Sequence, residues 1–284
     1  MKQQGVGIIG LGPVGSILGA YLARSGLKVY GVELDKARAQ QINAGGLRIR
    51  GFAELEEKPE HCFTSLRELS EIEDLAAVFL CTKTWALPGV MKDFCDLDWS
   101  ESTRIVAAMN GIGPEDLVGE YIPKERVCRG VINFAGNLEP DGWIAMNWFH
   151  PPNLLGPATE RTPKRMHDVA EILSQAGLTT LDVSHHEMKK AAFFKTVLNS
   201  ALNALCAAHG LTMARAMHLK HTRRTARVLL REGLTVAGLV GYNYGEDALD
   251  RCIEYLEGGG DHYLSLIHIS EPTRPPSTSR MPSS

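Results

Sequence analysis

The first half of the chain alternates short apolar runs with segments of helical periodicity. Six of these runs have the length and the valine- and isoleucine-rich composition of strands: 5–10, 28–33, 47–51, 76–81, 104–109 and 127–133. Helical patterns such as 14–25 and 36–43 separate them. This alternation is typical of βαβ units, which build a parallel sheet with helices on both faces. The pattern therefore predicts an α/β fold with a doubly wound parallel sheet.

The second half of the chain has a different pattern. Thr162-Pro163 has the form of a helix start, and we expect this helix to reach Gly177 before one more strand at 178–183. After that strand only helical patterns follow, at 186–209, 222–240 and 246–257. We therefore expect a sheet domain at 1–185 and an all-helical domain at 186–263.

The end of the chain changes composition abruptly after Gly258-Gly259-Gly260. Residues 264–284 are rich in Pro, Ser and Thr, as in a flexible C-terminal tail. The segment Leu264 to Arg274, LSLIHISEPTR, also matches the in-frame translation of a transposon-end adapter used to prepare sequencing libraries. We therefore expect 264–284 to be a non-native tail and the helical domain to be incomplete.

Composition and charge narrow the classes of partner. Apolar residues make up 44% of the chain and charged residues 22%, with a formal net charge of -3, as in a globular protein. Because the chain has no broad basic face, we expect neither nucleic acid nor a membrane surface as partner, but a small molecule. The six cysteines form no CxxC pair, and neither a signal peptide nor a long apolar span is evident. These features favour a cytoplasmic protein.

A glycine-rich loop directly follows the first expected strand and opens the first helix. Its residues are Gly10, Leu11, Gly12, Pro13, Val14 and Gly15. In a GxGxxG loop the first glycine permits the tight turn, the second lets the backbone approach a pyrophosphate, and the third allows close packing of helix on strand. In this position the loop predicts a Rossmann domain that binds a dinucleotide on the N-terminus of the helix.

The second expected strand ends at Glu33, where a carboxylate can accept hydrogen bonds from the adenosine ribose hydroxyls. The same carboxylate would repel a 2′-phosphate, so Glu33 favours NADH over NADPH. Lys36 and Arg38 lie close enough in sequence to complicate this preference. A solvated glutamate at a strand end is the alternative interpretation.

Three polar residues interrupt the otherwise apolar helical segment 193–205: Lys195, Asn199 and Asn203. At about 100° per residue their four-residue spacing places them within an arc of about 80°, as one stripe along two turns. A buried stripe of this kind needs polar partners. We therefore expect it to line a cleft between the two domains, where a substrate binds. A structural network in which Lys195 pairs with a carboxylate is the alternative.

Two further polar residues follow apolar strands of the sheet domain. Lys83 comes just after 76–81, and Asn110 comes just after 104–109 and begins Asn110-Gly111-Ile112-Gly113. Ligands bind at the carboxyl ends of the strands in doubly wound folds. The alternative interpretation gives these residues no function: Lys83 is then a solvated loop lysine, and Asn110 is an asparagine in a turn before glycine. No group of residues with metal-ligand spacing stands out.

Together, the glycine loop, Lys83, Asn110-Gly111 and the Lys195-x-x-x-Asn199-x-x-x-Asn203 helix resemble the ketopantoate reductase (2-dehydropantoate 2-reductase) family from Gly5 to Tyr263. The resemblance implies NADPH-dependent reduction of ketopantoate to pantoate, with Lys195 as general acid. It implies that Asn110 helps to hold cofactor and substrate, and that Asn199 and Asn203 bind the substrate. It also allows a homodimer formed through the helical domain.

Two departures from the family pattern carry expectations of their own. Glu33-Leu34 stands where the family has a basic residue, so the cofactor is NADH or NADPH. The family's acidic active-site residue falls where the adapter-like segment stands, so we expect the chain as written to bind cofactor but turn over poorly. A β-hydroxyacid dehydrogenase, which also carries a Lys-x-x-x-Asn pair, and a catalytically impaired dinucleotide-binding protein are the alternatives.

Overall fold

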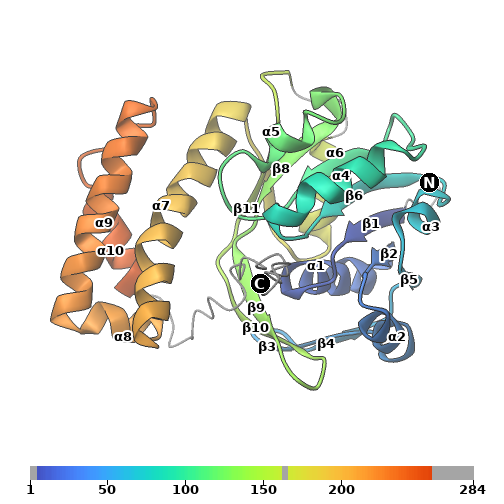
Figure 1. Cartoon of the computed structure of the whole chain (residues 1–284), viewed down its shortest axis with the longest axis horizontal. Coiled ribbons are helices and arrows are strands. Elements are labelled where there is room, and N and C mark those ends of the chain that lie inside the picture. Colours follow the sequence, from blue (N-terminus) through green and yellow to red (C-terminus); the bar gives the residue numbers. More distant parts are fainter. Residues whose placement is uncertain (1–4, 162–165, 258–284) are drawn as a thin grey trace, which may run out of the picture.

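The computed structural model describes residues 5–161 and 166–257, and shows a sheet domain and a helical domain joined by one long helix (Figure 1). The main sheet has the strand order β12-β11-β8-β7-β6-β1-β2-β5. Its strands are β1 Gly5–Ile9, β2 Lys28–Val32, β5 His61–Phe63, β6 Leu75–Leu80, β7 Arg104–Ala107, β8 Val127–Val131, β11 Asn153–Pro157 and β12 Thr180–Asp182. The chain builds the sheet in one direction from β1 to β2 and in the other direction from β6 onward, so the direction of winding changes between β1 and β6. Sheets of this kind bind ligands in the crevice at the carboxyl ends of these two strands.

The expected α/β class with a helical second part is confirmed, although the sheet differs from the expectation in two respects. β11 runs antiparallel to β8, so the sheet is mixed rather than wholly parallel. The segment 47–51 does form a strand, β3 Leu47–Gly51, but this strand belongs to a second sheet of order β4-β3-β10-β9. The other strands of that sheet are β4 Leu55–Glu57, β9 Phe134–Leu138 and β10 Ile144–Phe149.

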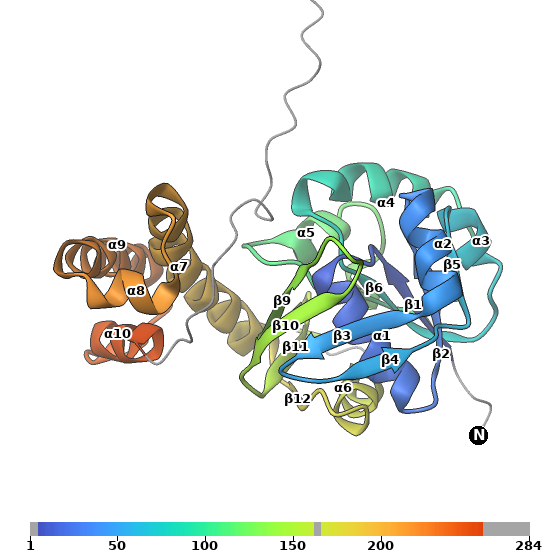
Figure 2. The same ribbon diagram turned by 90° about the horizontal axis from the view of Figure 1, so that it is seen from below.

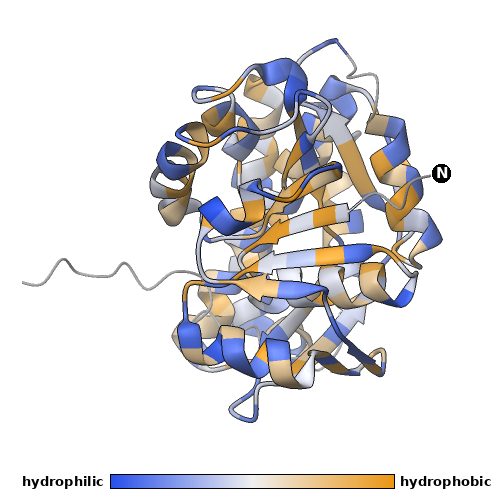
Figure 3. Ribbon diagram, turned by 90° about the vertical axis from the view of Figure 1, so that its right-hand side faces the viewer, coloured by the Kyte–Doolittle hydropathy of each residue, from blue (hydrophilic) through white to orange (hydrophobic). Residues whose placement is uncertain are grey.

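Helices cover both faces of the main sheet. On one face α1 Pro13–Arg24 packs between β1–β2 and the second sheet, and α6 Met166–Gln175 packs on β11 and β12. α2 Lys36–Gly45 packs on β5, and the other face carries α3 Leu66–Ser70, α4 Leu87–Cys95 and α5 Pro114–Val118. Apolar residues concentrate on the central strands and polar ones on the outer sides of the helices (Figure 3). The expected start of α6 at Thr162-Pro163 lies outside the described residues, as does 264–284.

The helical domain is built on α7 His185–His209, with α8 Met213–His218, α9 Lys220–Leu239 and α10 Ala248–Glu257 around it. Ser184 begins α7 through a capping box: its side chain accepts from the Glu187 backbone N–H, and the Glu187 side chain accepts from that of Ser184. Gly210, with φ +59°, ends the helix in the left-handed conformation. Among the described helices only α7 is long and apolar enough to cross a membrane, but the core helix of a globular protein meets the same criterion.

α7 is also the structural link between the two domains (Figure 2). Its first half packs on β8 and β11, where Met188 and Ala192 join Val131 in a small buried cluster. Its second half carries Val197 and further apolar residues of the helical core, and it contacts α8 and α9. Residues at the middle of α7, which include Lys195, therefore lie at the junction of the domains.

Candidate functional site

Three neighbouring cavities follow the carboxyl ends of the central strands. The adenosine-side cavity, of about 440 Å³, is lined by Gly10, Glu33, Leu34 and Arg67 among others. The glycine-loop cavity, of about 470 Å³, is lined by residues including Gly12, Pro13, Val14, Lys83, Asn110 and Ile132. The α7 cavity, of about 480 Å³, is lined by residues including Trp148, His150, Lys195, Asn199, Asn203 and Tyr255. Thr82 lines both of the first two cavities, so they adjoin.

The three glycines of the loop differ in backbone conformation and in the space around them. Gly10 has φ +92°, in the region that favours glycine. A Cβ on Gly15 would stand 2.1 Å from the Gly10 carbonyl oxygen, so only glycine allows this approach of α1 to the end of β1. A Cβ on Gly12 would meet no atom within 4 Å, because this residue faces the open glycine-loop cavity.

One buried polar atom beside this loop has no hydrogen-bond partner in the described part of the chain. The Oγ1 atom of Thr82 is buried and has no hydrogen-bond partner among the described residues, although it lies between the adenosine-side and glycine-loop cavities. Buried hydroxyls normally have a partner, so this one is suited to a ligand. With the open backbone at Gly12 and the N-terminus of the twelve-residue helix α1, the residues fit a bound dinucleotide.

Leu11 differs from the rest of the loop, because its side chain points into the core. It is fully buried and packs beneath Gly31, where a Cβ would stand 2.4 Å from the Leu11 Cδ1 atom. Its carbonyl oxygen accepts hydrogen bonds from the Arg38 guanidinium, at 2.8 and 3.1 Å, and from Ser16 Oγ at 2.7 Å. Leu11 therefore supports the loop from behind, and Arg38 is engaged by the protein.

Glu33 lies at the end of β2 and lines the adenosine-side cavity. Its Oε1 atom accepts from the Asp35 backbone N–H at 3.2 Å, and Asp35 in turn caps α2. The carboxylate is half-exposed. It therefore keeps acceptor capacity on the side of the cavity where the sequence predicts a ribose.

Lys83 and Asn110 lie together in the glycine-loop cavity, each just past the end of its strand. The Asn110 carbonyl accepts from Thr84 Oγ1 at 3.4 Å. Desolvation lowers the pKa of Lys83. The two sequence-predicted residues thus share a cavity with Gly12, Pro13 and Val14.

The polar stripe of α7 faces the third cavity. Lys195, Asn199 and Asn203 all line it, beside Trp148 and Tyr255. Lys195 Nζ donates to the carbonyl of Ile132, a residue that lines the glycine-loop cavity. Lys195 therefore lies where the α7 cavity meets the glycine-loop cavity. Asn110 lies in the glycine-loop cavity, apart from Asn199 and Asn203.

Among residues 5–161 and 166–257, no carboxylate compensates the charge of Lys195. In the described part of the chain no acidic side chain forms an ion pair with Nζ, whose hydrogen bond goes to a backbone carbonyl. Desolvation lowers the pKa of Lys195 to about 7, and the nearby positive charge of Arg129 contributes to the shift. An amine with this pKa can both give and take a proton near neutral pH.

Arg129, which sequence reasoning missed, is a buried cation inside β8. Its side chain is only 3% exposed, and Glu115, at 2% exposed, faces it with 3.8 Å between Nε and Oε2. The guanidinium also donates to the Gly111 carbonyl at 3.2 Å, next to Asn110. A charged residue in an otherwise apolar strand was the available signal.

All six cysteines lie in residues 5–161 and 166–257, and none of them forms a disulfide there. The same ranges contain no group of three His, Cys, Asp or Glu side chains placed to hold a metal ion.

Comparison with known proteins identifies the family. The family model described as ketopantoate reductase PanE/ApbA matches residues 6–154, and the model of its C-terminal region matches 187–271. The 2-dehydropantoate 2-reductase of Archaeoglobus fulgidus is 28% identical over 273 residues, which cover 95% of this chain and 86% of that protein. That of Lactococcus lactis is 27% identical over 83% of this chain and 74% of its own length.

Solved structures share the fold. The 2-dehydropantoate 2-reductase of Geobacter metallireducens has a TM-score of 0.80 at 22% identity, over 90% of this chain and 83% of that one. A D-mandelate dehydrogenase solved with NADH and anilino(oxo)acetate has a TM-score of 0.78 at 23% identity, over 93% of this chain and 84% of that one. Since the family model alone matches more than half of the chain, the chain belongs to the ketopantoate reductase family of oxidoreductases, which act on a keto or hydroxyl carbon.

Proposed function

We propose that this protein reduces a small 2-oxo acid with NAD(P)H, with ketopantoate as the first substrate to test and Lys195 as the proton donor. The observation that carries the proposal is the position of Lys195. Its ammonium meets the Ile132 carbonyl between a cavity formed by the glycine loop and a cavity lined by two carboxamides.

The cofactor site is assigned to the adenosine-side and glycine-loop cavities. A bound reduced nicotinamide supplies the hydride. Gly12 and the N-terminus of α1 would hold the pyrophosphate, and Thr82 Oγ1 would supply a further polar group to the cofactor. Lys83 and Asn110 line the end of the site nearest to Lys195 and orient what binds there.

Lys195 acts on the substrate oxygen. As the keto carbon gains a hydride, its oxygen gains negative charge, which the ammonium stabilises before transferring a proton to it. The net change consumes one hydride and one proton and converts the ketone to a secondary alcohol. Because the pKa of Lys195 is lowered to about 7, proton transfer to an alkoxide is more favourable than from an ordinary lysine. Asn199 and Asn203 offer donors to the carboxylate and other polar groups of the substrate.

NADH is the preferred cofactor in this proposal. Glu33 presents a carboxylate to the adenosine-side cavity, and Arg38, one of the two nearby basic residues, is occupied by the Leu11 carbonyl. Lys36, the other one, is not among the residues that line this cavity, whereas Arg67 lines it and offers a basic group to a 2′-phosphate. Measuring kcat/KM with both cofactors tests this preference. Glu33→Gln is expected to lower the ratio of kcat/KM for NADH to kcat/KM for NADPH by about tenfold. A wild-type protein with the higher kcat/KM for NADPH contradicts the assignment.

A substrate panel tests the reaction itself. Oxidation of NADH and of NADPH is followed with ketopantoate, with 2-oxo acids of increasing side-chain size, and with 3-oxo acids. The proposal predicts turnover of 2-oxo acids. Turnover confined to 3-oxo and 3-hydroxy acids would favour the β-hydroxyacid dehydrogenase alternative, and cofactor binding without turnover of any acid would favour a dinucleotide-binding protein.

A further inference from the structure

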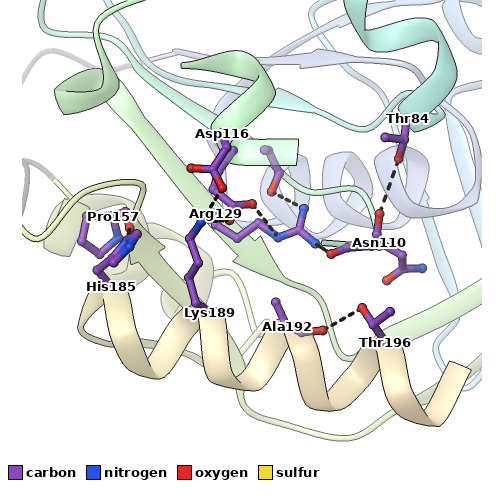
Figure 4. Close-up of polar contacts among 12 residues, drawn as sticks. Thr84, Asn110, Asp116, Arg129, Pro157, His185, Lys189, Ala192 and Thr196 are labelled. Atoms are coloured by element: carbon purple, nitrogen blue, oxygen red, sulfur yellow. Dashed lines mark hydrogen bonds and ion pairs between the residues drawn. The ribbon is translucent and has the colours of Figure 1, made fainter. Parts of the chain in front are cut away.

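The buried guanidinium of Arg129 contacts the loop that carries Asn110. It lies on β8, which ends just before Ile132, the residue whose carbonyl accepts from Lys195. It donates to the carbonyl of Ala107, the last residue of β7, at 3.5 Å and to the carbonyl of Gly111, which follows Asn110 in the next loop, at 3.2 Å. Figure 4 shows the guanidinium extending from its strand towards the Asn110 loop.

The opposite side of Arg129 is connected to α7. Glu115 lies between two cations, with Oε2 3.8 Å from Arg129 Nε and Oε1 3.3 Å from Lys189 Nζ. Lys189 also pairs with Asp116, and it precedes Lys195 on α7 (Figure 4). A contiguous set of contacts thus runs from the Asn110 loop through Arg129 and Glu115 to the helix that carries Lys195.

The position of Glu115 makes this arrangement costly to break. Glu115 and Arg129 are both almost completely buried, and removing one partner of such a pair leaves an uncompensated charge. Neither Arg129 Nε nor Glu115 Oε2 has a hydrogen-bond partner among the described residues, so their interaction is that of close, desolvated charges. The pKa of Arg129 is lowered to about 10 by desolvation, so the guanidinium stays charged at neutral pH.

We propose that Arg129 is a positioning residue of the reductase site, which fixes the Asn110 loop and the Lys195 helix relative to each other through its contacts with the Gly111 carbonyl and with Glu115. This inference rests on the proposed role of Lys195 as proton donor. Arg129 itself has no access to substrate, because its side chain is 3% exposed.

The charged and titratable groups around Lys195 come from several elements. Arg129 on β8 contributes a like charge, which disfavours the ammonium form. From the other side of the α7 cavity come His150, which follows β10, and Arg251 and Tyr255 on α10. Arg251 is paired with Asp247, with 3.1 Å between Nε and Oδ2. Arg129 is therefore the charged group whose removal should change Lys195 most.

The test combines a titration that needs no turnover with steady-state kinetics. The full chain is labelled with [ε-13C]lysine, and the Lys195 signal is assigned by its loss in Lys195→Met. Arg129→Met is expected to raise the pKa of Lys195 by about one unit or more, because a buried like charge is removed. Arg129→Lys is expected to keep the pKa low but lose the contact with Gly111. Arg126→Met is the matched control, since Arg126 donates to the Ser100 carbonyl at 2.7 Å at the other end of β8.

Kinetics separate positioning from charge. Arg129→Met is expected to lower kcat/KM by about ten- to hundredfold, because the loop and the helix are displaced. Arg129→Lys is expected to recover part of this loss, and Arg126→Met is expected to keep the wild-type kcat/KM. Because Arg129→Met leaves the buried Glu115 with Lys189 as its one remaining cationic partner among the described residues, Arg129→Met/Glu115→Gln is measured beside it as a charge-balanced variant. The same rise in the Lys195 pKa is expected there.

The outcomes distinguish this inference from the proposed function. If the wild-type protein reduces no 2-oxo acid, the proposed function fails, and the titration alone decides whether Arg129 sets the Lys195 charge. In an active enzyme, a kcat/KM within about threefold of wild type together with an unchanged Lys195 pKa, in folded Arg129→Met and in the double variant, would overturn the inference. A pKa that rises in both variants, with Arg126→Met unchanged, supports it.

Discussion

At the scale of single residues, the environment of Lys195 determines which chemistry it can perform. A lysine on an exposed helix keeps its proton throughout the physiological range. Here the amine rests against the Ile132 carbonyl, without a carboxylate among the described residues, and desolvation brings its pKa to about 7. The amine can therefore change its protonation state during turnover.

This lowered pKa predicts a pH dependence for reduction. Since the ammonium form donates the proton, the rate is highest below pH 7 and falls about tenfold per unit as pH rises through the Lys195 pKa. The measurement is the single-turnover rate of NADH oxidation between pH 5.5 and about 9.5. Lys195→Arg, which stays protonated, is the control in which this fall should disappear. A wild-type rate that remained flat to pH 9 (about two units above the expected midpoint) would contradict the assignment.

The glycine loop allows a matched pair of substitutions at residue scale. Gly12→Ala is expected to leave the melting temperature within about 2 °C but to weaken NADH binding at least about tenfold, because its methyl group enters only the cavity. Gly15→Ala is expected to destabilise the protein by about 2 kcal/mol or more, because its methyl group meets the Gly10 carbonyl. Calorimetric melting and fluorescence titration with NADH check both. Equal effects of the two variants on binding and stability would show that Gly12 has no special exposure to a ligand.

At the scale of elements, how α7 begins determines where its functional residues lie. Ser184 satisfies backbone donors at the first turn, eleven residues before Lys195 on a continuous helix. Ser184→Ala should therefore cost about 1 kcal/mol in the free energy of unfolding, measured by urea denaturation. Ser184→Asp, which can also cap, is the control. A loss below about 0.3 kcal/mol in the alanine variant would mean that the cap does not hold this end of the helix.

The elements also show what the sequence could and could not predict. Apolar runs located β1, β2, β6, β7 and β8, because strands buried on both faces are continuously apolar. Five strands were not foreseen. β4 and β5 have only three residues each, and β9, β10 and β11 are interrupted by polar residues or glycine. β3 was found as a strand but assigned to the wrong sheet, since pairing with β10 joins segments almost a hundred residues apart.

In the candidate site, too, features that depend on local sequence were predicted and features that depend on packing between distant segments were not. The glycine loop, Lys83, Asn110 and the α7 stripe were named from local spacing, and the structure gathers them around adjoining cavities. Leu11 was grouped with the loop by its position in the motif, but its side chain belongs to the core. The pairing of Arg129 with Glu115 was not predictable, because it depends on how α5 packs against β8.

At the scale of the whole molecule, the site depends on close packing between the domains. Gly156 on β11 allows α7 to approach the sheet, and a Cβ there would stand 2.3 Å from the Met188 Cβ. Lys195 lies further along the same helix, so displacement of α7 at Met188 moves it away from the glycine-loop cavity.

Gly156→Ala tests this dependence. The added methyl group is expected to cost about 1–3 kcal/mol in stability and to lower kcat more than it weakens NADH binding. Gly89→Ala on α4 is the control, since a Cβ there meets nothing within 4 Å and alanine favours the helix. Melting curves, NADH titrations and kcat are compared for both. If Gly156→Ala retained wild-type kcat despite its lower stability, the position of α7 would not limit turnover.

The central claim is that Lys195 donates the proton when a 2-oxo acid is reduced. The most direct measurement is the single-turnover rate of reduction by the preloaded cofactor complex, for the wild type and Lys195→Met at pH 6.5 (about half a unit below the lysine midpoint). The account predicts a loss of about 10²- to 10⁴-fold in rate, with the Kd for NADH unchanged within about threefold. A Lys195→Met rate within about threefold of wild type would contradict it.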